Sequence, residues 1–132
     1  MKKYIVDTNI FIRFLLKDNE KFYQQAKKYF DDAKEKKIVL ILISQVVFEI
    51  DYVLRSVYKL SHKESADILI NLVKSSYLQV ENRQVIGEAI EKYAEENIDL
   101  VDLFLIETAR KEKVEILSFD KDFLRKNKLG NE

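Results

Sequence analysis

The chain has 132 residues, of which 47% are hydrophobic and 35% are charged, and this composition predicts one folded domain over residues 1–132. It contains no cysteine and one histidine, His62, which excludes disulfides, thiol nucleophiles and, within one subunit, zinc sites built on several His or Cys residues. Basic and acidic residues number 23 each, so the formal net charge is zero. This balance argues against a protein that binds nucleic acid through overall charge.

Other classes are excluded by what the sequence lacks. The two glycines cannot supply the glycine-rich loops that bind nucleotide phosphates. The apolar runs are far shorter than the ~18 residues of a membrane span, and residues 1–7 do not have the pattern of a signal peptide. We therefore expect a soluble protein without a membrane partner, located in the cytoplasm, whose chemistry depends on carboxylates, hydroxyls and cations.

Apolar patterning predicts strands that alternate with helices along the chain. The predicted strands are residues 3–6, 38–43, 77–80 and 114–118. The predicted helices are residues 10–16, 20–37, 44–57, 61–75, 85–96 and 99–111, and a short terminal helix that begins at residues 120–123. Residues 61–64 (SHKE) predict a capping box at the start of the helix 61–75. The second strand is continuously apolar, which is typical of a strand covered on both faces. This order predicts an α/β fold of the three-layer α/β/α type, with a central parallel sheet of about four to five strands wrapped by helices.

Four acidic residues fall where such a fold places its ligands, at the carboxyl ends of the strands and on the helices beside them. Asp7 ends the first predicted strand, and Asp120 follows the last one by two residues. Glu49 and Asp102 lie near the starts of two helices, next to apolar stripes that are expected to face the core. Buried carboxylates are rare unless they are paired or bind a metal, so these four residues are candidates for one shared site.

Each acid also has a simpler interpretation. Asp7, Asp102 and Asp120 are all placed to stabilise a helix N-terminus. Glu49 is harder to explain in this way, because it interrupts an apolar stripe and has no cation four residues away. Four independent capping roles are less expected than one common site.

Four segments resemble, in order, the four motifs of PIN-domain nucleases. They are residues 5–9 (IVDTN), 44–49 (SQVVFE), 99–109 (DLVDLFLIETA) and 118–123 (SFDKDF). Each motif is weak alone, whereas the ordered set of four covers nearly the whole chain. The length of the chain and the order of its motifs are most similar to those of the toxin of VapBC-type toxin–antitoxin pairs.

The resemblance implies an endoribonuclease that depends on Mg²⁺ or Mn²⁺, and oxygen ligands without His or Cys independently suit such hard cations. Asp7 and Asp102 are predicted as direct ligands, and Glu49 and Asp120 would complete the catalytic and metal site directly or through water. Three further residues would orient these acids or a water molecule, namely Thr8, Asn9 and Ser44, although Ser44 is also a candidate N-cap.

Cations near the acids are candidates for binding RNA phosphates, and the simpler interpretation is an ordinary solvated surface. They are Arg13, Lys17, Lys121 and Arg125. The resemblance further implies an antitoxin protein as partner and a homodimer.

Other functions remain open. One alternative is a PIN-type nuclease that acts in RNA processing or on DNA flaps, and another is a non-catalytic interaction module that has kept the PIN fold. A phosphatase with an aspartyl nucleophile is disfavoured, because Asp7-Thr8-Asn9 lacks a second Asp two residues after the first.

Overall fold

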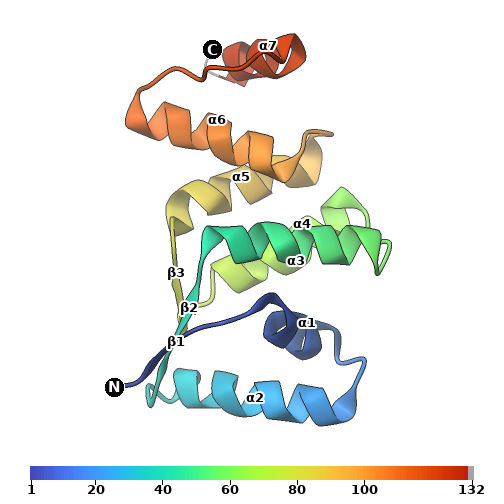
Figure 1. The fold of residues 1–132 in the computed structure, drawn as a ribbon, viewed down its shortest axis with the longest axis vertical. Helices are drawn as coiled ribbons and strands as arrows, with labels where there is room; N and C mark the ends of the chain where they lie inside the picture. The colour runs from blue at the N-terminus through green and yellow to red at the C-terminus, as the bar shows by residue number, and fades with distance from the viewer. Residues whose placement is uncertain (131–132) are drawn as a thin grey trace.

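The computed structural model describes residues 1–130, and the last two residues of the predicted domain, Asn131 and Glu132, lie outside this range. The described residues form three strands, β1 (Lys3–Ile5), β2 (Val39–Leu42) and β3 (Leu78–Val80), and seven helices. The helices are α1 (Thr8–Leu16), α2 (Glu20–Lys34), α3 (Ser44–Ser56), α4 (His62–Val73), α5 (Arg83–Glu95), α6 (Leu100–Glu112) and α7 (Lys121–Gly130). The predicted α/β class is confirmed, and the arrangement is like the three-layer α/β/α type (Figure 1).

The sheet is parallel, with the strand order β1-β2-β3. Its register places Tyr4 of β1 beside Leu40 of β2, and Leu40 beside Leu78 of β3. The prediction of about four to five strands was too high for the described residues, because the segment 114–118 forms no strand. This segment lies beyond α6, away from the sheet, and a β-strand requires a neighbouring edge with which to pair (Figure 1).

The sheet is covered unequally on its two faces. Leu40 and Leu42 of β2 are buried, whereas Val39 and Ile41, which point to the other face, are half-buried. The predicted cover on both faces is therefore complete on one face and partial on the other. At the edge of the sheet the Ile5 side chain remains 67% exposed.

The helices form where the apolar periodicity predicted them, with small shifts at their ends. In α4 the predicted capping box is confirmed, because the Ser61 side chain accepts from the Glu64 backbone N–H while Glu64 accepts from that of Ser61. The predicted N-cap at Ser44 was wrong, since α3 begins at Ser44 itself and Ile43 occupies the cap position. No helix within residues 1–130 has the length and apolar character that a membrane crossing requires.

Helix α6 is held on α5 by a buried apolar face and by a buried charge. Leu103 and Ile106 of α6 are buried. The carboxylate of Glu107, also buried, accepts hydrogen bonds from Lys92 of α5 and, at 3.2 Å, from Arg110. Buried carboxylates are stable only when paired in this way, so this cluster fixes α6 against α5.

Candidate active site

Two of the four predicted acids meet at the carboxyl ends of β1 and β2. Asp7 follows β1 and caps α1, where its Oδ1 accepts a 2.8 Å hydrogen bond from the Thr8 backbone N–H. The Thr8 hydroxyl then donates a 2.7 Å hydrogen bond to Oε2 of Glu49 on α3. Because Thr8 is buried and binds both carboxylates, it couples the end of β1 to the first turns of α3.

These acids border a surface hollow, called here the Asp7–Glu49 hollow. It is lined by Asp7, Thr8, Asn9, Gln45, Phe48, Glu49, Tyr52 and Val53. The predicted positioning residue Asn9 is thus beside the acids. The aromatic side chains of Phe48 and Tyr52 were not singled out from the sequence, although each lies within one turn of Glu49 on α3.

Glu49 does not point into the core, contrary to the expectation drawn from its apolar neighbours. It is exposed, and the buried acid of α3 is instead Asp51. Asp51 is paired with Arg55 at 3.0 Å and accepts hydrogen bonds from Ser65 at 2.7 Å and from the Tyr93 hydroxyl at 3.0 Å. The true inward face of α3 therefore includes a carboxylate whose partners lie on three helices.

Asp51 and its three partners, Arg55, Ser65 and Tyr93, are called here the Asp51 cluster. The environment of this cluster fixes the charges of its members. Burial raises the pKa of Tyr93, so this phenol stays protonated and donates to Asp51. The hydrogen bond to Asp51 raises the pKa of Arg55, which therefore remains a cation. This cluster holds α3 against α4 and α5, and so it fixes the helix that carries Glu49.

Asp102 and Asp120 border a different hollow, called here the Asp102–Asp120 hollow. It lies between α6, the following segment and α7, and its lining includes Leu105, Thr108, Ser118 and Phe123. Asp120 accepts a 3.1 Å hydrogen bond from the backbone N–H of Phe123, so it caps α7 as its simpler interpretation predicted.

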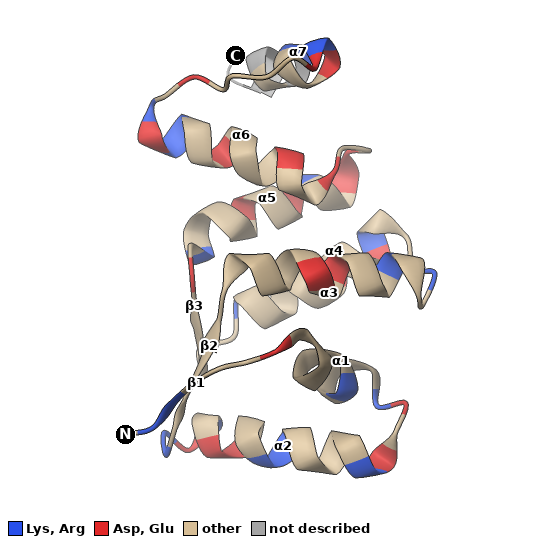
Figure 2. Ribbon diagram, viewed as in Figure 1, with Lys and Arg blue, Asp and Glu red and all other residues tan. Residues whose placement is uncertain are grey.

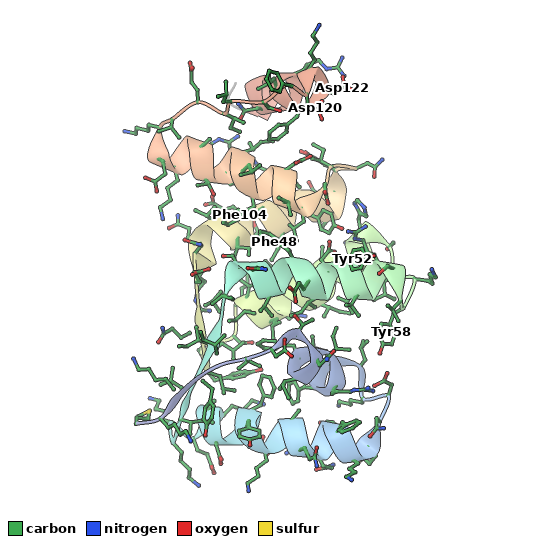
Figure 3. All side chains as sticks on the ribbon, in the orientation of Figure 1. Phe48, Tyr52, Tyr58, Phe104, Asp120 and Asp122 are labelled. Carbon is green, nitrogen blue, oxygen red and sulfur yellow. The ribbon has the colours of Figure 1, made fainter. Side chains whose placement is uncertain are left out.

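The two hollows lie apart in this structure. Figure 3 shows Asp120 at α7, beyond α6, whereas Phe48 and Tyr52 of the Asp7–Glu49 hollow lie on α3. Between them, Phe104 of α6 packs edge-on against Phe48, with ring centroids 5.3 Å apart. Within the described part of the chain, no three acidic or histidine side chains converge closely enough to hold a metal ion. The physical reason is that no strand places Asp120 beside Asp7.

Ser44 is bonded to an acid that sequence reasoning missed. Its backbone N–H donates a 3.0 Å hydrogen bond to Glu81 Oε1, and its hydroxyl accepts one from Asn82 at 3.1 Å. The sequence position of Glu81 could have identified it, because this acid directly follows β3 just as Asp7 closely follows β1. Ser44 thus links the ends of β2 and β3.

The predicted cations are spread over two regions. Arg13 pairs with Asp18 at 3.3 Å and lies over the Phe22 ring, and the Lys17 amine lies over the Tyr23 ring. Arg125 pairs with Asp122 at 3.3 Å, near the exposed Lys121. Figure 2 shows that both signs of charge occur along α2, α6 and α7.

Residues 4–129 match the family model for the PIN domain. The chain belongs to the PIN domain family. The resemblance carried by the four motifs is thereby confirmed. This PIN domain is also 25% identical over 127 residues to the VapC ribonuclease of Aquifex aeolicus (strain VF5), covering 96% of this chain and 91% of that protein. No solved structure matches it significantly.

Proposed function

We propose that this PIN domain is an endoribonuclease that depends on Mg²⁺ or Mn²⁺ and is the toxin of a type II toxin–antitoxin pair. Membership of the PIN domain family and the likeness to a VapC ribonuclease support this proposal. The observation that carries it is the pair of carboxylates at the carboxyl ends of neighbouring strands, Asp7 and Glu49, coupled through Thr8.

The Asp7–Glu49 hollow suits a divalent cation by the chemistry of its donors. Mg²⁺ prefers oxygen ligands, and it is commonly held by one or two carboxylates together with water and substrate phosphate. Asp7 and Glu49 supply two carboxylates, and Asn9 adds an amide oxygen to the lining. When bound, the ion would supply Lewis-acid stabilisation of negative charge at a scissile phosphate.

The side chains of the hollow would then have distinct tasks. Asp7 and Glu49 would hold the ion, and Thr8 keeps the Glu49 carboxylate in place by its 2.7 Å hydrogen bond. Arg13 on α1 and Lys17 at its C-terminus would contact RNA phosphates. Asp102 and Asp120 would complete the acidic site, and Lys121 and Arg125 would bind phosphates on that side.

The partners follow from the same proposal. RNA is the substrate, an antitoxin protein would cover the active-site groove, and the active form would be a homodimer in the cytoplasm. The domain would comprise residues 1–132.

The proposal is tested by incubating the purified protein with a mixed RNA pool in the presence of Mn²⁺, Mg²⁺ or EDTA. We expect cleavage with either metal, none with EDTA, and a loss of at least about 100-fold in Asp7→Asn and Glu49→Gln, because both remove a charge from the metal site. Asp67→Asn is the matched control, since Asp67 is an exposed acid on α4 outside both hollows.

Metal-independent cleavage would refute the metal dependence, and equal cleavage by the wild type and Asp7→Asn would refute the assigned site. Intact RNA with either metal would refute the nuclease assignment. The toxin assignment has a separate test, which is bacterial growth after induced expression. We expect arrest with the wild type and normal growth with Asp7→Asn, and relief of the arrest by the cognate antitoxin.

A further inference from the structure

Helix α3 presents an open aromatic side chain one turn beyond Glu49. Tyr52 is 65% exposed, whereas the exposed aromatic residues of α2, Phe22 and Tyr29, are each 44% exposed. A tyrosine ring is a large and mostly apolar surface, and covering such a surface is favourable. Tyr52 also lines the Asp7–Glu49 hollow, so a molecule bound at the two acids meets this ring.

The ring shares one face of the helix with the acid. Gln45, Glu49 and Tyr52 are spaced by four and then three residues, and all three side chains are exposed. This spacing places side chains in a row on one face of a helix, where the Cβ atoms of neighbours are about 5–6 Å apart. All three line the hollow, which therefore combines an amide, a carboxylate and an aromatic ring.

The neighbouring ring of Phe48 is fixed, whereas that of Tyr52 is uncovered. Phe48 is half-buried and packs edge-on against Phe104 of α6, with ring centroids 5.3 Å apart (Figure 3). On α2, the Phe22 ring is covered by the guanidinium of Arg13, which lies 5.0 Å from the ring centroid. Among the side chains that the structure describes, none places a ring or a cation over Tyr52. The faces of this ring are therefore open to a ligand.

A nucleotide has the two groups that this surface can bind. Its phosphate would lie at a cation held by Asp7 and Glu49, and its base has a flat π face that stacks on an aromatic side chain. The formal net charge of the chain is zero, so attraction between the whole protein and a polyanion supplies little affinity. A stacking contact supplies affinity without charge. Bases in a duplex already stack on each other, and only an unpaired base can turn onto the ring.

We propose that Tyr52 is a stacking platform for an unpaired base of RNA next to the scissile phosphate, and that it selects single strands over duplexes at the Asp7–Glu49 hollow. This inference rests on the proposed function, because the two acids locate the scissile phosphate. Every base has a π face, so the platform favours unpaired RNA without reading a particular sequence. Phe48 would form a fixed apolar wall beside the stacked base.

A fluorescence titration tests the platform directly. Because the chain contains no tryptophan, Tyr52→Trp introduces a single indole at the proposed position. Three probes of about 12 nucleotides are added with Ca²⁺ in place of Mg²⁺, namely oligoadenylate, an abasic strand with the same phosphates, and oligoadenylate annealed to oligouridylate. We expect oligoadenylate to quench the indole emission by stacking, and the other two probes to leave it nearly unchanged. The control is Val57→Trp, because Val57 at the C-cap of α3 lies outside the hollow and is 64% exposed.

Equal quenching by oligoadenylate and the abasic strand would overturn the proposal, because contacts to phosphate alone would then explain the binding. Quenching by the duplex as strong as that by the single strand would overturn it too, and so would equal quenching in Val57→Trp. If none of the three probes quenches the emission of Tyr52→Trp, the proposal is also overturned, and a protein partner becomes the better occupant of the ring.

The kinetics of RNA cleavage separate stacking from catalysis. Tyr52→Leu keeps an apolar side chain and removes the π face, whereas Tyr52→Phe keeps the ring. We expect Tyr52→Leu to raise KM for single-stranded RNA about 10-fold with kcat nearly unchanged, because stacking holds the base equally before and during cleavage. Tyr52→Phe should match the wild type, and both variants should keep the wild-type Tm because the side chain is exposed. Equal KM values for Tyr52→Leu and the wild type would overturn the proposal.

The two measurements distinguish this inference from the proposed function. Base-dependent quenching of Tyr52→Trp, beside a wild type that cleaves no RNA with Mg²⁺ or Mn²⁺, would refute the proposed function and leave the stacking platform standing. Metal-dependent cleavage by the wild type, beside quenching that does not depend on the base, would overturn the platform and leave the nuclease assignment standing.

Discussion

At the residue scale, the hydroxyl of Thr8 connects the two carboxylates of the Asp7–Glu49 hollow. It donates to Glu49 while the backbone N–H of the same residue donates to Asp7. Thr8→Val removes the hydroxyl and keeps the branched shape, so Glu49 loses its fixed position. We expect affinity for Mn²⁺, measured by calorimetry, to fall about 10–100-fold. Thr8→Ser retains the donor and should bind nearly as the wild type does, and equal binding by Thr8→Val would show that this bond does not position Glu49.

A second prediction at this scale concerns the buried carboxylate of Asp51. Its loss leaves Arg55, Ser65 and Tyr93 without their shared acceptor. We expect Asp51→Ala to lower the free energy of unfolding by about 3–5 kcal/mol, because breaking a buried ion pair leaves an uncompensated charge. Urea denaturation measures this change. Asp67→Ala, at an exposed acid on α4, should change stability by less than about 0.5 kcal/mol, and a similarly small effect at Asp51 would contradict the structural role of the cluster.

At the scale of the element, the capping box of α4 makes stability depend on pH. The hydrogen bond that the Ser61 N–H donates to Glu64 lowers the pKa of this carboxyl below its usual value. Glu64 therefore stabilises the fold above its usual pKa, and this contribution is lost as the pH falls through its lowered value. As the pH falls from about 6 to about 3, we expect Glu64→Gln to lose less stability than the wild type does. Thermal melts across that pH range measure the difference.

The exposed acid Asp67 on the same helix provides the control for that measurement. Asp67→Asn should follow the pH dependence of the wild type, because its carboxyl does not take part in the capping box. Parallel pH curves for Glu64→Gln and the wild type would show that the box does not carry the effect.

The elements also show what the sequence could predict. Helices and capping boxes depend on residues three or four apart, so α4 and its capping box were predicted correctly. The carboxyl-end rule predicted that Asp7 and Glu49 lie together, because β1 and β2 pair directly. The strand at 114–118 was not formed, since pairing depends on an edge supplied by distant residues. Asp120 lies apart from Asp7 for the same reason, because no paired strand at 114–118 carries Asp120 to the sheet.

At the scale of the whole molecule, the described residues place the four predicted acids in two separate hollows, and they include one open strand edge and one strand-forming segment that does not pair. The open edge of β1 adjoins one hollow, and residues 114–118 adjoin the other. Exposed apolar side chains border both regions, including Ile5 and Leu117, and such side chains mark interaction surfaces.

The proposed homodimer would make stability depend on protein concentration. Mass action favours a folded dimer over unfolded chains as the protomer concentration rises, so we expect the Tm of the wild type to increase by a few degrees for each tenfold increase. Sedimentation should show the same equilibrium, with a dimer at high protein concentration and a monomer on dilution. A wild-type Tm that stays constant over a hundredfold range of concentration would contradict the proposed homodimer.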